Sequence, residues 1–337
     1  MRKNRNLPQG EVRRLEIESK ALAGNMLGDP TRRDLHVYLP PGFKSGDRLP
    51  LLVDLVGFTG SGQSHTNWKN FGENAPERLD RLIGEGKMPP VVVAFPDCFS
   101  RLGGNQYINS ASIGLYEDYL LGEVVPLVEK TLGVGGHGRR GVFGKSSGGY
   151  GAIVHAMRHA DFWSAAACHS GDMAFELCYL VDLPKVLMEL ATKHGGSIER
   201  FIRYFESALK PGDKDMLVLN FIAMAASYDP DPGQFLGIRL PCDPETAELI
   251  AERWANWQAH DPVRMVEKST ANFRQLKALY VDCGDRDQFN LLYGARQLNR
   301  ALKRLGIAHR YEEFPDDHSS VDYRMDESLP FLARALS

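Results

Sequence analysis

The segment Gly-Lys-Ser-Ser-Gly at residues 144–148 has the composition of a turn that presents a nucleophile. It matches the pattern G-x-S-x-G, in which a serine lies on a tight, strained turn between a strand and a helix. A short apolar run (140–144) precedes it, and a helix pattern rich in small residues (147–159) follows. We predict that Ser146 is the nucleophile and that the backbone N–H of Ser147 faces the developing negative charge. The alternative is an ordinary Gly-Ser turn.

A serine hydroxyl is a weak nucleophile unless a general base takes its proton. Among the ten histidines, His318 follows the last predicted strand, 309–314, in a loop that would return over the edge of the sheet where Ser146 lies. We therefore predict that His318 is the base, since serine, acid and histidine would then follow one another in an order known from catalytic triads.

The carboxylate that orients such a histidine is expected on the loop after the strand pattern 276–283. Two aspartates lie on that loop, and we favour Asp287, immediately before the helix pattern 289–305, with Asp285 as the alternative. Either carboxylate could instead cap the helix that follows. The spacing of the aspartates does not match a calcium loop, and we expect neither a metal nor a cofactor.

A tetrahedral intermediate needs a second donor besides Ser147, and we assign it to the backbone N–H of Phe58 in the glycine-rich loop 57–62. Other side chains on loops and in an aromatic-rich segment are candidates for contact with substrate, although loop hydrogen bonding and core packing are the commoner roles of such residues. They are Asn105, Tyr107, His169, Asp172, Trp254 and Trp257.

Strand and helix patterns alternate along most of the chain, which predicts an α/β fold with a mostly parallel central sheet and helices on both faces. The alternating segments 12–19 and 35–39 are expected to form an antiparallel pair at the sheet edge. Residues 172–259 break the alternation and carry helix patterns only. We predict a single domain, 1–337, with 172–259 as a helical insertion over the carboxyl ends of the strands, as a lid or pocket wall.

The composition excludes several classes of protein. A hydrophobic share of 43% with 25% charged residues argues against a disordered chain, and a net charge of −3 argues against a nucleic-acid-binding surface. The five cysteines form no CxxC pair, which favours reduced thiols and a cytoplasmic location. Segment 1–8 is basic without a following apolar run, and no membrane span is expected. The oligomeric state stays open.

Several motifs in one order resemble the putative esterase family of α/β-hydrolases, which includes esterase D (S-formylglutathione hydrolase), enterochelin esterases, feruloyl esterases and mycolyltransferases. The matching segments are 37–43, 57–60, 116–119, 123–126, 144–149, 282–289 and 318–319. The resemblance implies a Ser146–His318–Asp287 triad and hydrolysis of a small carboxylic ester through an acyl-enzyme. An acyltransferase and a non-catalytic ligand-binding protein on the same scaffold are the alternatives. The insertion lengthens the chain between nucleophile and acid beyond what is usual in the family, so no relative's substrate follows directly.

Overall fold

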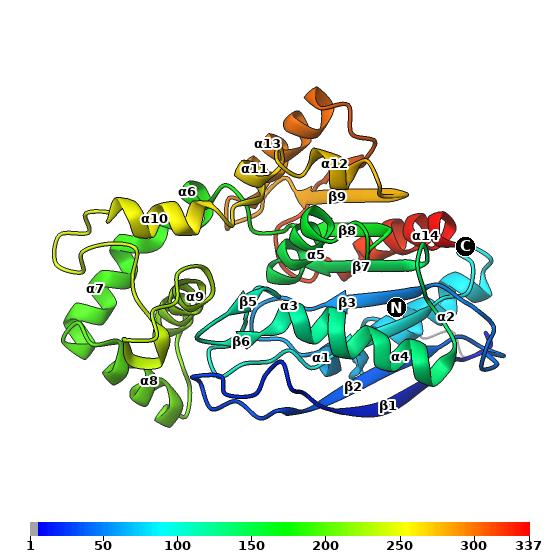
Figure 1. The fold of residues 1–337 in the computed structure, drawn as a ribbon, viewed down its shortest axis with the longest axis horizontal. Coiled ribbons are helices and arrows are strands. Elements are labelled where there is room, and N and C mark those ends of the chain that lie inside the picture. Colours follow the sequence, from blue (N-terminus) through cyan, green and yellow to red (C-terminus); the bar gives the residue numbers. More distant parts are fainter. Residues whose placement is uncertain (1–5) are drawn as a thin grey trace.

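The computed structural model describes residues 6–337, so most of the basic N-terminal segment 1–8 lies outside the described residues. An eight-stranded sheet forms the centre of the fold (Figure 1). Its strands are parallel except for the antiparallel pairs β1–β2 and β2–β4. In spatial order they are β1 (Glu11–Glu18), β2 (Arg32–Leu39), β4 (Val92–Pro96), β3 (Leu51–Leu55), β7 (Arg140–Lys145), β8 (Ala165–His169), β9 (Ala278–Gly284) and β10 (Arg310–Phe314). The predicted antiparallel edge pair and the mostly parallel sheet are thus confirmed.

The central strands are apolar throughout because helices cover both faces of the sheet. Every residue of β3 is buried, and its side chains alternate between two hydrophobic clusters: Leu51 and Val53 belong to one, Leu52 to the other. Helices α4 (Val125–Leu132), α5 (Ser147–Arg158) and α13 (Leu291–Arg304) contribute to the first cluster; α2 (Ala75–Gly84) and α14 (Met325–Leu336) contribute to the second.

Residues 116–132 have apolar side chains at helical spacing and form three consecutive helical elements. They are α3 (Tyr116–Asp118), a π-helical segment η1 (Tyr119–Val124) and α4. The amide of Val125 donates to Leu120 O, five residues back. The following residue, Pro126, has no N–H to continue the regular α-helical pattern, which accounts for a wider turn at this point.

Residues 172–259 contain helices and, apart from an isolated bridge between Cys242 and Leu249, no strand pairing, as predicted. Figure 1 shows the longer helices gathered at one end of the sheet. The elements are α6 (Phe175–Cys178), η2 (Leu180–Asp182), α7 (Leu183–His194), α8 (Ile198–Ser207), α9 (Asp213–Tyr228), η3 (Phe235–Gly237) and α10 (Ala251–Gln258).

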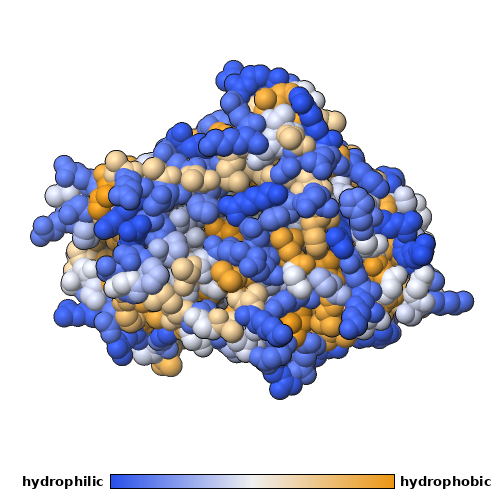
Figure 2. Space-filling view, in the orientation of Figure 1, coloured by the Kyte–Doolittle hydropathy of each residue, from blue (hydrophilic) through white to orange (hydrophobic). Residues whose placement is uncertain are grey.

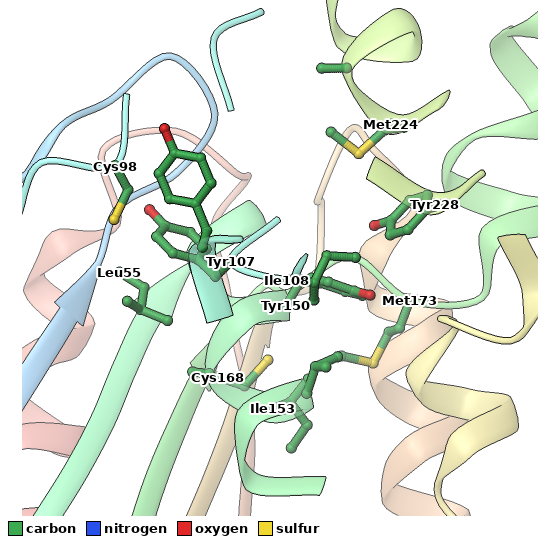
Figure 3. Packing of buried hydrophobic residues seen from close by; sticks show 14 of the residues in the cluster. Leu55, Cys98, Tyr107, Ile108, Tyr150, Ile153, Cys168, Met173, Met224 and Tyr228 are labelled. Atoms are coloured by element: carbon green, nitrogen blue, oxygen red, sulfur yellow. The ribbon is translucent and has the colours of Figure 1, made fainter. Parts of the chain in front are cut away.

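The insertion shares its core with the sheet. Tyr150 of α5 lies 5.7 Å from Tyr228 of α9, ring centroid to ring centroid, and Figure 3 shows both among one group of buried side chains. Helix α9 therefore packs against the helix that follows Ser146.

The remaining elements are short. They are α1 (Gly62–Thr66), the hairpin β5 (Asn109–Ser110) and β6 (Gly114–Leu115), α11 (Pro262–Met265), α12 (Thr270–Phe273) and η4 (Asp322–Arg324). Polar residues dominate the face shown in Figure 2, with small apolar patches between them. Within residues 6–337, no helix has the length and apolar character needed to span a bilayer.

Candidate active site

Ser146 lies on the turn between β7 and α5 in a backbone conformation that serine rarely adopts. Its φ is 58° and its ψ is −125°. Two hydrogen bonds hold this conformation: Ser146 N donates to His169 O at 2.9 Å, and Tyr150 N donates to Ser146 O at 2.8 Å as α5 begins. Neighbouring structure thus stabilises a strained backbone, which is common at functional sites.

The two glycines of the motif are required by the close approach of strand β3. A Cβ on Gly148 would lie 1.7 Å from Leu55 O, and one on Gly144 would lie 2.3 Å from the same oxygen. Neither position has room for a side chain, because β3 pairs directly with β7 at this point (Leu55 opposite Gly144). The G-x-S-x-G pattern therefore reflects packing between adjacent parallel strands as well as the turn itself.

His318 and Asp287 meet in space from loops after two different strands. His318 Nδ1 lies 2.7 Å from Asp287 Oδ2, and the other carboxylate oxygen accepts from the backbone N–H of Phe289 at 3.0 Å. The Phe289 ring packs edge-on against the imidazole, with the ring centroids 4.9 Å apart. Asp287 therefore contacts the histidine and also accepts from the Phe289 backbone just before α13, whose N-cap residue is Asn290.

Asp285, the alternative acid, points elsewhere. Its carboxylate is 45% exposed and forms an ion pair with Arg286, whereas the Asp287 side chain is fully buried. Since the two aspartates are two residues apart on a turn, only one of them can face His318. The structure pairs Asp287 with the histidine.

Phe58 and Ser147 line the same pocket as Ser146. In the part of the chain that the structure describes, neither backbone N–H donates to a protein acceptor, although Thr59 and Gly60 beside Phe58 both do. The Phe58 ring is positioned by two glycines, since a Cβ on Gly104 would lie 2.9 Å from it and one on Gly103 3.2 Å. Both N–H groups are therefore free to bind an oxyanion.

A pocket of about 500 Å³ connects these groups with the helical insertion. Its size is within the range of small-molecule sites. Residues from the β-strand loops form one side and residues of the insertion form the other, as the sequence predicted for a pocket wall. The lining residues are Gly57, Phe58, Lys145, Ser146, Ser147, Asp172, Cys178, Tyr179, Asp182, Asp213, Met216, Leu217, Asn220, Phe289, Leu291 and His318.

Of the six candidate substrate contacts, only Asp172 lines this pocket. Asn105 is buried and donates to Cys98 O at 2.5 Å, while the Tyr107 hydroxyl donates to Val56 O at 2.6 Å. Trp254 and Trp257 pack against each other with ring centroids 5.8 Å apart, inside the insertion. Contrary to the expectation of substrate contact, these four side chains do not line the pocket. Asn105 and Tyr107 are hydrogen-bonded to backbone carbonyls, and the two tryptophans pack in the core.

His169 also has a structural position. Its Nδ1 lies 2.7 Å from Asp282 Oδ1 and its Nε2 lies 2.8 Å from Ser328 Oγ, so both ring nitrogens are engaged below the turn. The contact of His169 with Ser146 is through its backbone carbonyl. Its expected place on the pocket wall is not observed, because its side chain points toward α14.

Sequence patterns did not single out the residues that α6 and α9 contribute to the pocket, such as Cys178 and Asn220. Lys145 was recognised only as a variable position of the motif. It lines the pocket, and burial lowers the pKa of its ammonium group, although the charges of Asp322 and Asp287 oppose this effect. For the residues of α6 and α9, helical periodicity predicts a helix but does not indicate which face of that helix lines a pocket.

Comparison with known proteins decides the family. The model of the family described as "Putative esterase" matches residues 29–326. The chain belongs to the putative esterase family. That membership makes it a carboxylesterase-type hydrolase and agrees with the resemblance found in its motifs.

Solved structures of the same α/β-hydrolase fold are similar over nearly the whole chain. A ferulic acid esterase superposes with a TM-score of 0.60 at 21% identity, covering 98% of this chain and 100% of that one. An S-formylglutathione hydrolase from Staphylococcus aureus gives 0.59 at 18%, covering 96% and 99%. A ferulic acid esterase from Anaeromyces mucronatus gives 0.56 at 15%, covering 100% and 95%. At these identities the likeness establishes the fold of this esterase family member and leaves its substrate open.

Proposed function

We propose that the protein hydrolyses a small carboxylic ester through an acyl-enzyme on Ser146, with His318 as general base and acid and Asp287 as the orienting carboxylate. The observation that carries the proposal is the convergence on one pocket of a serine in a strained turn and a histidine bound to a buried aspartate. Family membership supports ester hydrolysis as the reaction.

In the first step, Ser146 Oγ attacks the ester carbonyl while its proton moves to His318 Nε2. Asp287 accepts from Nδ1–H, which leaves Nε2 unprotonated to receive that proton and stabilises the imidazolium that forms. The backbone N–H groups of Phe58 and Ser147 bind the oxyanion of the tetrahedral intermediate. The bond from carbon to the leaving oxygen then breaks, and His318 returns its proton to the leaving alkoxide.

In the second step, His318 takes a proton from water, whose oxygen attacks the acyl carbon. The new intermediate collapses, the bond to Ser146 Oγ breaks, and His318 returns the proton to the serine. No further group is needed to balance this reaction.

The test uses p-nitrophenyl acetate and a fluorophosphonate probe with the wild-type protein and Ser146→Ala. The wild type should release p-nitrophenol and be labelled covalently at Ser146. The variant should be unlabelled, should have the same thermal unfolding profile to within a few degrees, and should lose about 10³-fold or more in kcat. Undiminished turnover by Ser146→Ala would contradict the proposal.

The organisation of residues 1–337 as one domain and the cytoplasmic location stay predictions. All five cysteines are buried and unpaired, which supports the latter.

A further inference from the structure

Asp172 is the one buried carboxylate of the pocket whose two oxygens have different surroundings. Oδ2 accepts hydrogen bonds from Gln106 Nε2 and from the Tyr179 hydroxyl, both at 2.9 Å. Oδ1 accepts no hydrogen bond from any residue in the range 6–337. Asp172 as a whole residue retains 8% exposure and lines the pocket that also contains Ser146. One oxygen is thus held in place while the other remains available at the pocket wall.

On the side away from the pocket, the side chains around Asp172 donate hydrogen bonds to its carboxylate. Tyr228 OH lies 2.8 Å from Gln106 Nε2 and 3.2 Å from the Tyr179 hydroxyl, so these three side chains and the carboxylate form a closed buried network. An ionised carboxylate can only accept hydrogen bonds, whereas amide N–H and hydroxyl groups can donate. Asp172 is therefore where the donated hydrogen bonds of this network end, and its free oxygen presents an acceptor to the pocket.

The backbone under Gln106 is fixed in an unfavourable conformation. Gln106 and Tyr107 both have positive φ, 55° and 58°. Asn105 and Tyr107 are anchored to neighbouring backbone carbonyls, and His155 Nε2 binds Tyr107 O at 2.8 Å. Two consecutive residues in the left-handed region cost free energy, which the surrounding contacts must offset. The fold thus holds Gln106 rigidly against Asp172.

We infer that Asp172 is a specificity-determining residue whose Oδ1 accepts a hydrogen bond from a hydroxyl or ammonium group of the ester substrate. This inference rests on the function proposed above and narrows its substrate class to esters that carry such a donor. Esters that carry a carboxylate are disfavoured, because a substrate anion would face the anionic Asp172 in a largely desolvated site.

Other charged groups on the pocket wall are less suited to this role. Asp182 forms an ion pair with Lys185 at 2.8 Å, and Asp213 is exposed in the first turn of α9. Lys145 also lines the pocket, and the negative charges of Asp322 and Asp287 act on its ammonium group. Asp172 is the only one of these carboxylates that is both buried and held in one orientation by donors on the side away from the pocket.

The experiment compares kcat/KM for esters that differ in one terminal group. One series consists of methyl ω-hydroxyalkanoates of graded length, the isosteric methyl alkanoates and the corresponding monomethyl dicarboxylates. A second series, acetates of diols and of matching alkanols, places the donor on the alcohol side. Burial raises the pKa of Asp172, against the hydrogen bonds from Gln106 and Tyr179, so the assays are run at pH 8 to keep the carboxylate ionised.

The wild type should prefer the hydroxyl ester over its methyl isostere about tenfold or more in at least one series, as expected for a hydrogen bond to a charged group. In Asp172→Asn, the amide oxygen must face Gln106 and Tyr179, which turns its NH₂ group to the pocket. That variant should reduce the gain for the hydroxyl ester, because the substrate hydroxyl can then only accept a weaker, uncharged hydrogen bond from the NH₂ group, and it should accept the carboxylate ester better than the wild type does.

Asp213→Asn is the matched control, because it removes one negative charge from the same wall without touching the network, and it should keep the wild-type ratio. Tyr179→Phe is the second variant if Asp172→Asn does not fold; loss of one donor to Oδ2 should also lower the ratio. Equal rates for the matched esters, or an equal change of ratio in Asp213→Asn, would overturn the inference. Turnover of p-nitrophenyl acetate, which carries no donor, reports on the proposed hydrolase alone, and its absence would overturn both proposals.

Discussion

His318 Nδ1 and Asp287 Oδ2 lie 2.7 Å apart although 31 residues separate them in the chain. The loops that carry them follow β9 and β10, which are parallel neighbours in the sheet. Because parallel neighbours end at the same edge, the two loops are adjacent, and burial of Asp287 strengthens its attraction for the imidazole N–H.

The first prediction separates the two aspartates of this loop. Asp287→Asn should lower kcat toward p-nitrophenyl acetate by up to about 10⁴-fold, because an amide NH₂ next to Nδ1 favours the wrong tautomer of His318. Asp285→Asn, which changes an exposed carboxylate on the same loop, should stay within a few-fold of the wild type. A larger loss in Asp285→Asn than in Asp287→Asn would reverse our assignment of the acid.

The second prediction concerns the strain at Ser146. With φ at 58° and ψ at −125°, this position suits glycine better than any residue with a Cβ. We expect Ser146→Gly to have a free energy of unfolding higher than that of Ser146→Ala by about 1–2 kcal/mol. Urea denaturation of the two inactive variants measures the difference, and equal stabilities would show that the turn is not strained in solution.

The third prediction concerns the contact between the motif and strand β3. Gly148→Ala should destabilise the fold by about 3 kcal/mol or more, since its Cβ would overlap the backbone oxygen of Leu55, and both α5 and β3 are packed in the core. Gly122→Ala is the control, because no atom lies within 4 Å of a Cβ there. A Gly148→Ala protein as stable as this control would be incompatible with the packing described.

The fourth prediction is a pH dependence of stability that arises from His155. This buried imidazole binds Tyr107 O through Nε2, and Trp163 Nε1–H donates to its Nδ1 at 3.1 Å, so a second ring proton would face another donor. Burial lowers its pKa to about 4. The unfolded chain, with a pKa near 6.5, then binds more protons at mildly acidic pH, and stability falls as the pH drops below about 6.5.

For this single group, the expected loss between pH 7 and pH 5 is about 2 kcal/mol. His155→Gln supplies an uncharged donor and acceptor in place of the imidazole, so its free energy of unfolding should decrease less over the same interval. Chemical denaturation at both pH values gives the comparison. If both proteins lose the same free energy, His155 is not the group that titrates.

The sequence alone was sufficient to predict the features that depend on residues close together in the chain. Alternation of apolar runs and helix patterns predicted the sheet and its helices, because a strand that is buried on both faces consists mostly of consecutive apolar residues. The glycines around Ser146 predicted the turn, since only residues without a side chain tolerate that backbone and that contact. The π-helical segment before Pro126 shows the limit of periodicity, because the helical spacing of apolar residues over 116–132 does not indicate where the hydrogen-bonding pattern changes.

Tertiary structure decided which side chains meet. The sequence favoured Asp287 over Asp285 but left both open, and the path of the loop after β10 brings His318 to Asp287. The link between Gln106 and Asp172 joins segments 66 residues apart, and no local pattern marks it. Contacts of this kind depend on packing between distant segments, so the type of reaction could be predicted from the chain, whereas the shape and polarity of the pocket became visible only in the folded protein.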